Sequence, residues 1–155
     1  MDGLVALRTQ ITQTAPGSAL DQDFDFREFD GMGFIPRFAT FEILNLASLA
    51  PAAATFFVTA ILSQTDQPGA PALGLSSSKY AFAVWKQLYG NGVQAAGAGS
   101  GEVVIHGDSV CRRGNMSIKL DSVNSGALVS LGCTVYGEVV ELTDLQLAQL
   151  AFIPV

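Results

Sequence analysis

Three aspartates at alternate positions are the feature of the sequence closest to a metal site. Asp21, Asp23 and Asp25 have the Asp-x-Asp-x-Asp spacing with which calcium loops present carboxylate oxygens to a hard cation. An EF-hand loop starting at Asp21 needs glycine at its sixth position and glutamate at its twelfth, where this chain has Phe26 and Met32. In an extended backbone, alternate carboxylates lie about 6.6 Å apart, too far to chelate one ion. We therefore expect a solvated or partner-facing acidic face and no metal.

The chain has one histidine, and its neighbours do not predict a hydrolytic site. His106 is followed by Asp108 and Ser109. In a strand, His106 and Asp108 share one face and Ser109 points to the other, so the three do not form a catalytic triad. There is no Gly-x-Ser-x-Gly nucleophile elbow, and nothing in the spacing of the acids sets two of them across a cleft. We expect a structural or surface histidine and no catalytic residues.

A glycine-rich segment and two cysteines complete the residues that could do chemistry. Gly97, Gly99 and Gly101 have the spacing of a phosphate-binding loop, but such a loop opens a helix, whereas here a strand-like run begins with Glu102. We therefore expect no nucleotide and no other cofactor.

Cys111 and Cys133 fall in two neighbouring strand-like runs. They can form a disulfide only if their Cα atoms lie within about 7 Å of each other. In a cytosolic product two buried free thiols are favoured, and no histidine accompanies them at zinc spacing.

Charge is scarce throughout the chain. Of 155 residues, 14% are charged and 49% are hydrophobic, and the net charge is −6. Soluble globular domains average about 25% charged residues, so much of this surface is expected to be covered by partners. The acid excess argues against binding duplex nucleic acid, which requires a basic face. The length fits a single domain.

The start of the chain and one long uncharged run raise the question of membrane targeting. The start, Met1-Asp2-Gly3, lacks the basic region of a signal peptide, so we expect synthesis in a reducing cytosol. Residues 43–65 carry no charge and are long enough for a membrane helix. Pro51 lies near the middle of that run, where it would break a helix. We expect two strands joined by a turn and no membrane partner.

The N-terminal part differs in character from the rest. Residues 1–38 contain a polar stretch with little periodicity and then a cluster of acids interleaved with phenylalanines, which predicts an extended arm laid over an apolar surface. A single β-rich domain is expected over 39–155. The side chains we expect to contact a partner are Phe24, Phe26, Phe29 and Phe34 in the arm and Arg112 and Arg113 at a turn.

Several runs of the domain have strand character. Thr40–Leu46 and Thr55–Leu62 are rich in β-branched and aromatic residues, while Lys79–Tyr89 fits a helix with a serine cap or an alternating strand. Three further runs are separated by short Gly/Asn loops, which predicts a three-stranded antiparallel meander: Glu102–Cys111, Met116–Val123 and Ala127–Leu142. In the last run, Gly132 and Gly137 predict a bulge or two shorter strands. A short helix is expected from Thr143 to Leu150.

The expected fold is therefore mainly β: an antiparallel β-sandwich or barrel-like domain with an extended N-terminal arm and one or two short helices. The favoured function is a non-enzymatic structural protein of a symmetric assembly, a phage or other viral virion protein that cements or decorates a capsid. Its partners would be itself, other capsid subunits or both, with a homo-oligomer expected in the virion after synthesis in the host cytoplasm. The alternative is a carbohydrate-binding or adhesive β-sandwich module, which would expose Tyr80, Trp85 or Tyr89; otherwise the large aromatic residues are expected in the core.

Overall fold

The computed structural model describes residues 3–15, 20–24, 32–45, 56–63, 81–89, 100–107, 110–111, 116–123 and 128–143. These residues contain eight strands and no helix. The strands are β1 (Val5–Thr12), β2 (Leu20–Asp23), β3 (Met32–Ile43), β4 (Phe56–Ser63), β5 (Ala81–Tyr89), β6 (Ser100–Val104), β7 (Ser117–Val123) and β8 (Ser130–Glu141). A search for a helix of membrane-spanning length and hydropathy within the same residues finds none.

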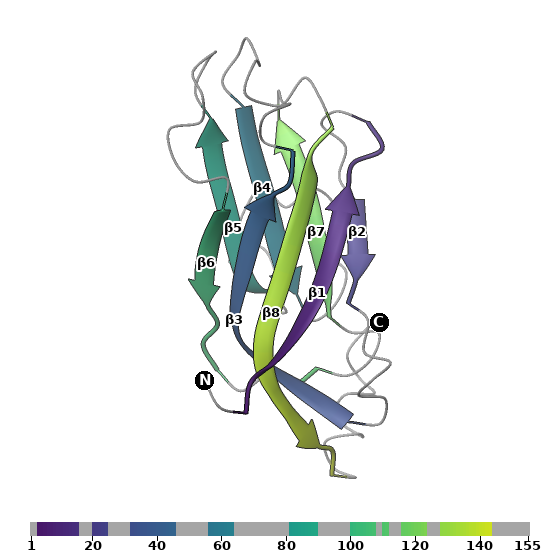
Figure 1. Cartoon of the computed structure of the whole chain (residues 1–155), viewed down its shortest axis with the longest axis vertical. Coiled ribbons are helices and arrows are strands. Elements are labelled where there is room, and N and C mark those ends of the chain that lie inside the picture. The colour runs from purple at the N-terminus through teal and green to yellow at the C-terminus, as the bar shows by residue number, and fades with distance from the viewer. Residues whose placement is uncertain are drawn as a thin grey trace.

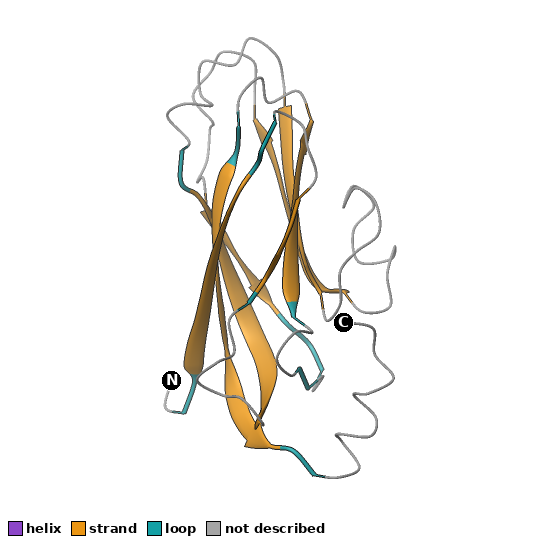
Figure 2. Ribbon diagram, turned by 90° about the vertical axis from the view of Figure 1, so that its right-hand side faces the viewer, coloured by secondary structure: helices purple, strands orange, loops and turns teal. Residues whose placement is uncertain are grey.

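The strands form two four-stranded sheets packed face to face, which confirms the predicted β-sandwich (Figure 1; Figure 2). One sheet has the order β1-β8-β3-β6 and the other β2-β7-β4-β5, and all neighbouring strands are antiparallel. Along the chain, every connection crosses between the sheets except the one from β4 to β5. This order is that of a jelly roll, which closes its two sheets where β1 approaches β2 and β5 approaches β6.

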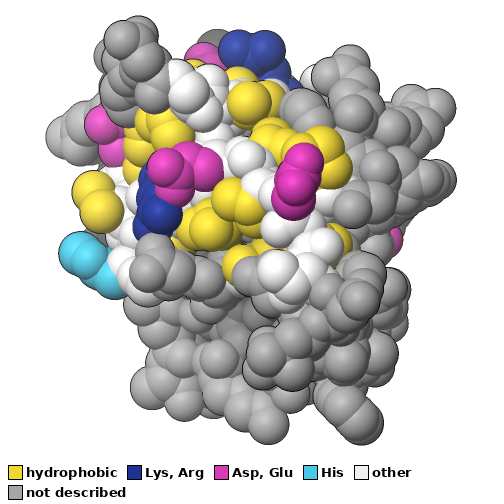
Figure 3. All heavy atoms as spheres, turned by 90° about the horizontal axis from the view of Figure 1, so that it is seen from below, with side chains coloured by type: hydrophobic (Ala, Val, Ile, Leu, Met, Phe, Trp, Pro, Cys, Tyr) yellow, Lys and Arg dark blue, Asp and Glu magenta, His cyan; other side chains and the backbone are white. Residues whose placement is uncertain are grey.

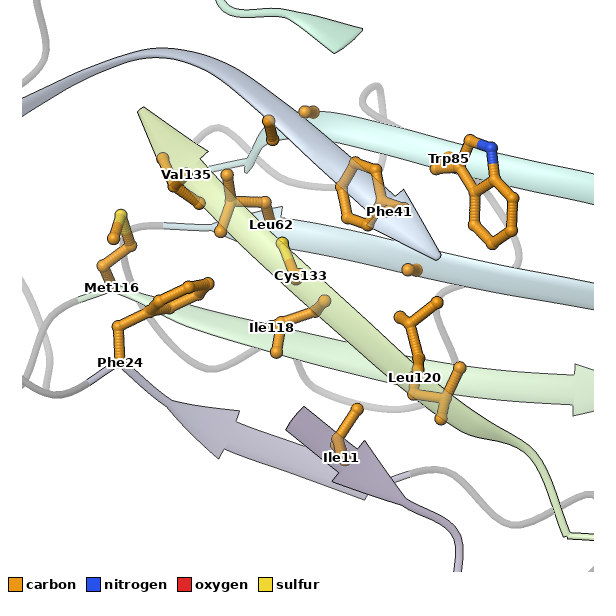
Figure 4. Packing of buried hydrophobic residues seen from close by; sticks show 14 of the residues in the cluster. Ile11, Phe24, Phe41, Leu62, Trp85, Met116, Ile118, Leu120, Cys133 and Val135 are labelled. Atoms are coloured by element: carbon orange, nitrogen blue, oxygen red, sulfur yellow. The ribbon is translucent and has the colours of Figure 1, made fainter. Parts of the chain in front are cut away.

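Alternation along each strand fills the space between the sheets with apolar side chains. In β8 every second residue from Leu131 to Gly137 is buried, and the residues between them face outward. Phe41 of β3 and Trp85 of β5 stack across the two sheets, with ring centroids 5.8 Å apart and planes inclined by 3° (Figure 4). Gly101 leaves room for this indole, because a Cβ there would lie 2.9 Å from Trp85 Cδ1. The core therefore joins both sheets.

A β-bulge interrupts the pairing of β3 with β8. The register shifts between Pro36 and Phe38, so that Arg37 is an extra residue on β3 opposite Gly137. Proline lacks the N–H that a regular ladder needs, which accounts for the position of the bulge. The carbonyl of Arg37 accepts a hydrogen bond from the N–H of Ile105 at 2.8 Å, so the bulge also ties down the chain after β6.

A buried polar cluster closes one end of the sandwich. Gln13 is 2% exposed, and its amide nitrogen donates to Ser122 Oγ at 2.9 Å while its amide oxygen accepts from the N–H of Val129 at 3.0 Å. The Gln13 N–H donates in turn to the Val129 carbonyl at 3.0 Å. The cluster links the ends of β1 and β7 and the start of β8, which satisfies polar groups that would be costly to bury alone.

The predicted three-stranded meander is wrong. β6, β7 and β8 are strands, but they alternate between the sheets: β6 pairs with β3, β7 with β2 and β4, and β8 with β1 and β3. The first run is also shorter than predicted, since β6 ends at Val104 and Cys111 makes an isolated bridge to Phe34. Short loops indicated hairpins, but each strand has its apolar face buried against the opposite sheet and its edges paired with distant strands.

The described residues of segment 1–38 belong to both sheets, which corrects the division into an arm and a separate domain. They form β1, β2 and the first part of β3. In β1, Leu7 and Ile11 are buried while Arg8 and Gln10 are exposed. The alternation is weak in sequence because the inward face includes the polar Thr9 and the outward face the apolar Ala6.

Other expectations for the strands can be compared directly. The two strands expected on either side of Pro51 are present as the end of β3 and as β4, and residues 81–89 form a strand, β5, in place of the alternative helix. β8 is a single strand, and the bulge associated with Gly137 lies on its neighbour β3. The short helix expected over residues 143–150 lies outside the described residues, apart from Thr143.

Candidate interaction surface

The solvent-facing side of the β1-β8-β3-β6 sheet, which is nearer the viewer in Figure 1, is here called the outer face. The strand register aligns its side chains in three rows that each cross all four strands. In the order β1, β8, β3, β6 the rows are Ala6-Tyr136-Phe38-Val104, Arg8-Thr134-Thr40-Glu102 and Gln10-Gly132-Glu42-Ser100.

The first row is apolar. The rings of Phe38 and Tyr136 stack with centroids 4.5 Å apart and planes inclined by 14°. Val104, at the edge of the sheet, is 65% exposed, and a hollow of about 280 Å³ lies between it and the neighbouring side chains of Phe38 and Glu102. An exposed β-branched residue beside stacked rings on an edge strand is typical of a contact surface.

The second row carries opposite charges at its two ends. Arg8 lies on β1 and Glu102 on β6, with two threonines between them. Three strand spacings separate these end residues, about 14 Å, so they cannot pair within one chain. Within the described residues, no ion pair involves Arg8, Glu102 or the nearby Glu42.

The third row surrounds a depression. Gly132 has no side chain, and a hollow of about 360 Å³ lies over it, lined by Arg8, Gln10, Glu42 and Leu44 among others. Leu44 is 45% exposed. The hollow combines one guanidinium, one amide and one carboxylate with an apolar wall, which suits a polar side chain from a partner.

The end of the sandwich beside the β-bulge is also partly apolar. Figure 3 shows this end from below, with hydrophobic side chains interspersed with a few acidic and basic ones. Arg37 makes an ion pair with Glu138, with Nε 2.7 Å from Oε2, and the two side chains are 35% and 46% exposed. A pair this exposed contributes little to stability and holds the Arg37 side chain over β8.

Two of the phenylalanines expected to contact a partner lie inside the molecule. Phe24 is 4% exposed and Phe34 is fully buried, and both belong to the hydrophobic core between the sheets. Phe24 is buried beside the exposed Asp23, and the apolar surface that Phe24 and Phe34 cover is that of their own sandwich. The other expected contact residues lie outside the described residues: Phe26, Phe29, Arg112 and Arg113.

The residues considered for chemistry are dispersed. Asp21 and Asp23 lie on β2, whereas Asp25 is outside the described part, within which no three metal-ligating side chains come together. His106 is exposed in the loop after β6, and its neighbours Asp108 and Ser109 are not described.

The aromatic residues of the alternative binding-module hypothesis can be placed in part. Trp85 is 7% exposed and stacked on Phe41, which confirms its expected place in the core and is contrary to a sugar-binding position. Tyr80 and the side chain of Tyr89 are outside the described residues.

Both cysteines are buried free thiols, as expected. Cys111 is fully buried and Cys133 is 2% exposed, and burial in apolar surroundings raises the pKa of each thiol far above its ordinary value. The folded chain therefore keeps both groups as neutral thiols, which are poor nucleophiles.

We expect neither thiol to react with Ellman's reagent at pH 8 in the native chain and both to react in guanidinium chloride. The pKa of each thiol is higher in the folded chain than in the unfolded chain. The buried neutral thiols therefore contribute to the free energy of unfolding below about pH 9, and this contribution is lost as the pH rises further. A variant carrying Cys111→Ala and Cys133→Ala should lose stability less steeply between pH 8 and pH 10. Rapid labelling of the native chain would contradict the burial of the thiols.

Sequence reasoning did not identify the outer face, although part of its signal is visible. Local alternation can show which residues of a strand point outward, as for Arg8 and Gln10 on β1 and for Glu102 and Val104 on β6. Their alignment into rows depends on pairings between β1 and β8 and between β6 and β3. No local pattern specifies those pairings.

Comparisons with known proteins give only a weak similarity of fold. No protein-family model matches the chain, and no curated protein matches it in sequence. Among solved structures, a chain from the empty head of turnip yellow mosaic virus has a TM-score of 0.43 at 12% identity, covering 91% of this chain and 83% of that chain. A second turnip yellow mosaic virus chain has a TM-score of 0.39 at 10% identity, covering 90% of this chain and 97% of that one. Both TM-scores are below 0.5, so the similarity carries no inference about what this chain does.

Proposed function

We propose that this chain is a non-enzymatic structural subunit of a symmetric protein assembly, specifically a virion protein that cements or decorates a capsid. The observation that carries the proposal is the strand order of the two sheets, β1-β8-β3-β6 and β2-β7-β4-β5. This jelly roll is an architecture on which viral shells are built, and lectin domains share it. Architecture alone does not specify function, so the surface must supply the rest of the argument.

The composition of the outer face supports a subunit that is covered by neighbours. Its first row, Ala6-Tyr136-Phe38-Val104, carries no charge, and the three charged residues of the face, Arg8, Glu42 and Glu102, lie in the other two rows. Uncharged positions together with stacked aromatic rings characterise the centre of protein interfaces. The chain as a whole is also poor in charge, with 14% charged residues. A free monomer with this surface would be poorly protected against association.

The alternative, a carbohydrate-binding or adhesive module, has less support. It required an exposed aromatic platform, and Trp85 is in the core. Phe38 and Tyr136 remain on the outer face, but they stack on each other within one row. A sugar panel that quenches tyrosine fluorescence would favour this module over the assembly subunit.

The test of the proposed function is the mass of the full chain in solution. We expect light scattering over a range of protein concentrations to show discrete oligomers or closed particles, with electron micrographs showing a regular shape. Dilution should dissociate them, because the surface contacts are reversible. A chain that stays monomeric at every concentration and ionic strength would contradict a subunit that assembles with itself.

A further inference from the structure

We propose that two copies of this chain pack outer face to outer face about a two-fold axis. The axis lies between the two faces, parallel to the strands, above the boundary between β8 and β3 of each copy. This inference rests on the proposed function, since it names a second copy as the partner of this surface. A two-fold interface is isologous, so each residue must find a complementary residue on the same surface of the other copy. The three rows of the outer face meet this condition.

Rotation about such an axis reverses the order of each row. In the charged row, Arg8 then lies opposite Glu102 of the second copy, and the two threonines, Thr134 and Thr40, lie opposite each other. The same contacts occur twice, once on either side of the axis. The two end charges that lie about 14 Å apart in one chain therefore become two intermolecular ion pairs.

The apolar row is self-complementary in the same way. Ala6, a small residue, lies opposite the exposed Val104 of the second copy, and Tyr136 lies opposite Phe38 of the second copy. Four aromatic rings then form one cluster across the axis, which removes the half-buried rings and the exposed valine from water. Small residues face large ones at the edges of the row, as close packing requires.

The third row fits the depression over Gly132. In the rotated copy Glu42 lies opposite Gly132, where the hollow of about 360 Å³ is lined by Arg8, Gln10 and the chain's own Glu42. A carboxylate entering the hollow meets a guanidinium and an amide donor, and the guanidinium of Arg8 balances the two carboxylates that then share the hollow. Each Arg8 therefore lies between two carboxylates of the second copy, that of Glu102 directly opposite and that of Glu42 diagonally opposite.

The size of the face predicts a reversible dimer. Four strands spaced about 4.8 Å apart and five residues along each strand give a face of about 19 Å by about 17 Å. The two faces together then cover about 650 Å², below the about 1,200 Å² at which stable specific interfaces begin, so the contact is weak and transient. Sheets packed face to face align within about 30° because each sheet is twisted, which is compatible with an axis parallel to the strands.

The test is a charge exchange followed by sedimentation velocity on the full chain. Arg8→Glu places two carboxylates opposite each other at both ends of the charged row, and Glu102→Arg places two guanidinium groups there. We expect either variant alone to raise the dissociation constant at least tenfold. Mixing the two variants should restore a dimer, because opposite charges then meet at both ends, and the double variant R8E/E102R should restore it in a single chain.

Two matched charge reversals serve as controls. Glu141→Arg alters an exposed acid at the end of β8, outside the three rows, and Lys86→Glu alters an exposed base on β5 of the other sheet. Neither should change the dissociation constant of the dimer. Circular dichroism and thermal unfolding of each variant establish that it is folded before its mass is interpreted.

The outcomes separate this inference from the proposed function. Wild-type assembly that is unaffected by R8E and E102R overturns the inference and leaves the assembly function standing. A wild-type chain that is monomeric at all concentrations overturns the inference and the self-assembly of the chain, and leaves only attachment to a capsid of other subunits. Where the wild-type chain itself stops at the dimer, mixed variants that grow beyond twice the mass of one chain show a head-to-tail contact and overturn the two-fold arrangement, whereas a mixture that also stops at the dimer supports it.

Discussion

Replacing Gly137 by alanine is expected to destabilise the protein by about 3 kcal/mol, the upper end of the range for overpacking a well-filled interior. A Cβ at this position would lie 2.7 Å from Phe34 Cζ and 2.9 Å from the carbonyl carbon of Ile35. The second of these atoms is backbone and belongs to the bulged segment of β3, so it cannot move aside at low cost. The measurement is guanidinium unfolding at equilibrium, followed by circular dichroism.

The same substitution on the same strand provides the control. At Gly132 the nearest atom to a new Cβ is Leu44 Cδ2 at 3.4 Å, an ordinary van der Waals contact with a flexible side chain. Because alanine loses less backbone entropy than glycine in a strand, Gly132→Ala is expected to gain about 0.5 kcal/mol or to be neutral. Equal stabilities of the two variants would contradict the close contact between Gly137 and the bulge.

Truncating Phe41 to alanine is expected to cost about 3–5 kcal/mol, since it removes a fully buried aromatic ring and leaves a cavity between the sheets. The ring also stacks on Trp85, the only tryptophan, at a centroid distance of 5.8 Å. The emission of Trp85 should therefore shift to longer wavelength as water reaches the cavity. Equilibrium unfolding gives the loss of stability, and the fluorescence maximum of the folded variant gives the local change.

Phe38, on the same strand, is the matched control for Phe41. It faces outward and stacks on Tyr136, so Phe38→Ala is expected to cost about 1 kcal/mol and to leave Trp85 emission unchanged. If Phe41→Ala does not fold, Phe41→Leu keeps much of the apolar volume and should cost about 1–2 kcal/mol. A variant Phe41→Leu as stable as the wild type, with unchanged Trp85 emission, would show that Phe41 is not at the centre of the core.

The local patterns of the chain were sufficient to place most strands. Runs of β-branched and aromatic residues predicted the strands β4, β7 and β8. For residues 81–89 the sequence allowed a helix or a strand, and the structure contains the strand β5. The proline within 43–65 was enough to exclude a membrane helix there, because a proline in a helix interior loses a hydrogen bond whatever the surroundings. The charge-poor composition and the buried state of Cys111 and Cys133 were also legible from the sequence.

The same patterns misplaced β1 because its periodicity is weakened by Thr9 on the inward side and Ala6 on the outward side. The same patterns led us to expect that Phe24 and Phe34 contact a partner, for a related reason. A phenylalanine in a segment rich in acids indicates that the chain has an apolar and a polar side, but it does not show which apolar surface the ring covers. In this fold that surface is the interior of the chain's own sandwich.

The sequence by itself determined that this protein is mainly β, that its strands have one apolar side, and that few of its residues are charged. These properties follow from side-chain type and from the two-residue period of a strand, both of which are local. Only the tertiary structure decided which strands are neighbours, as when β1 pairs with β8 from the other end of the chain. The cost of closing a loop grows only slowly with its length, so partner choice depends on how well whole apolar faces pack. The outer face, with Arg8 and Glu102 at opposite ends of one row, exists only because of that choice.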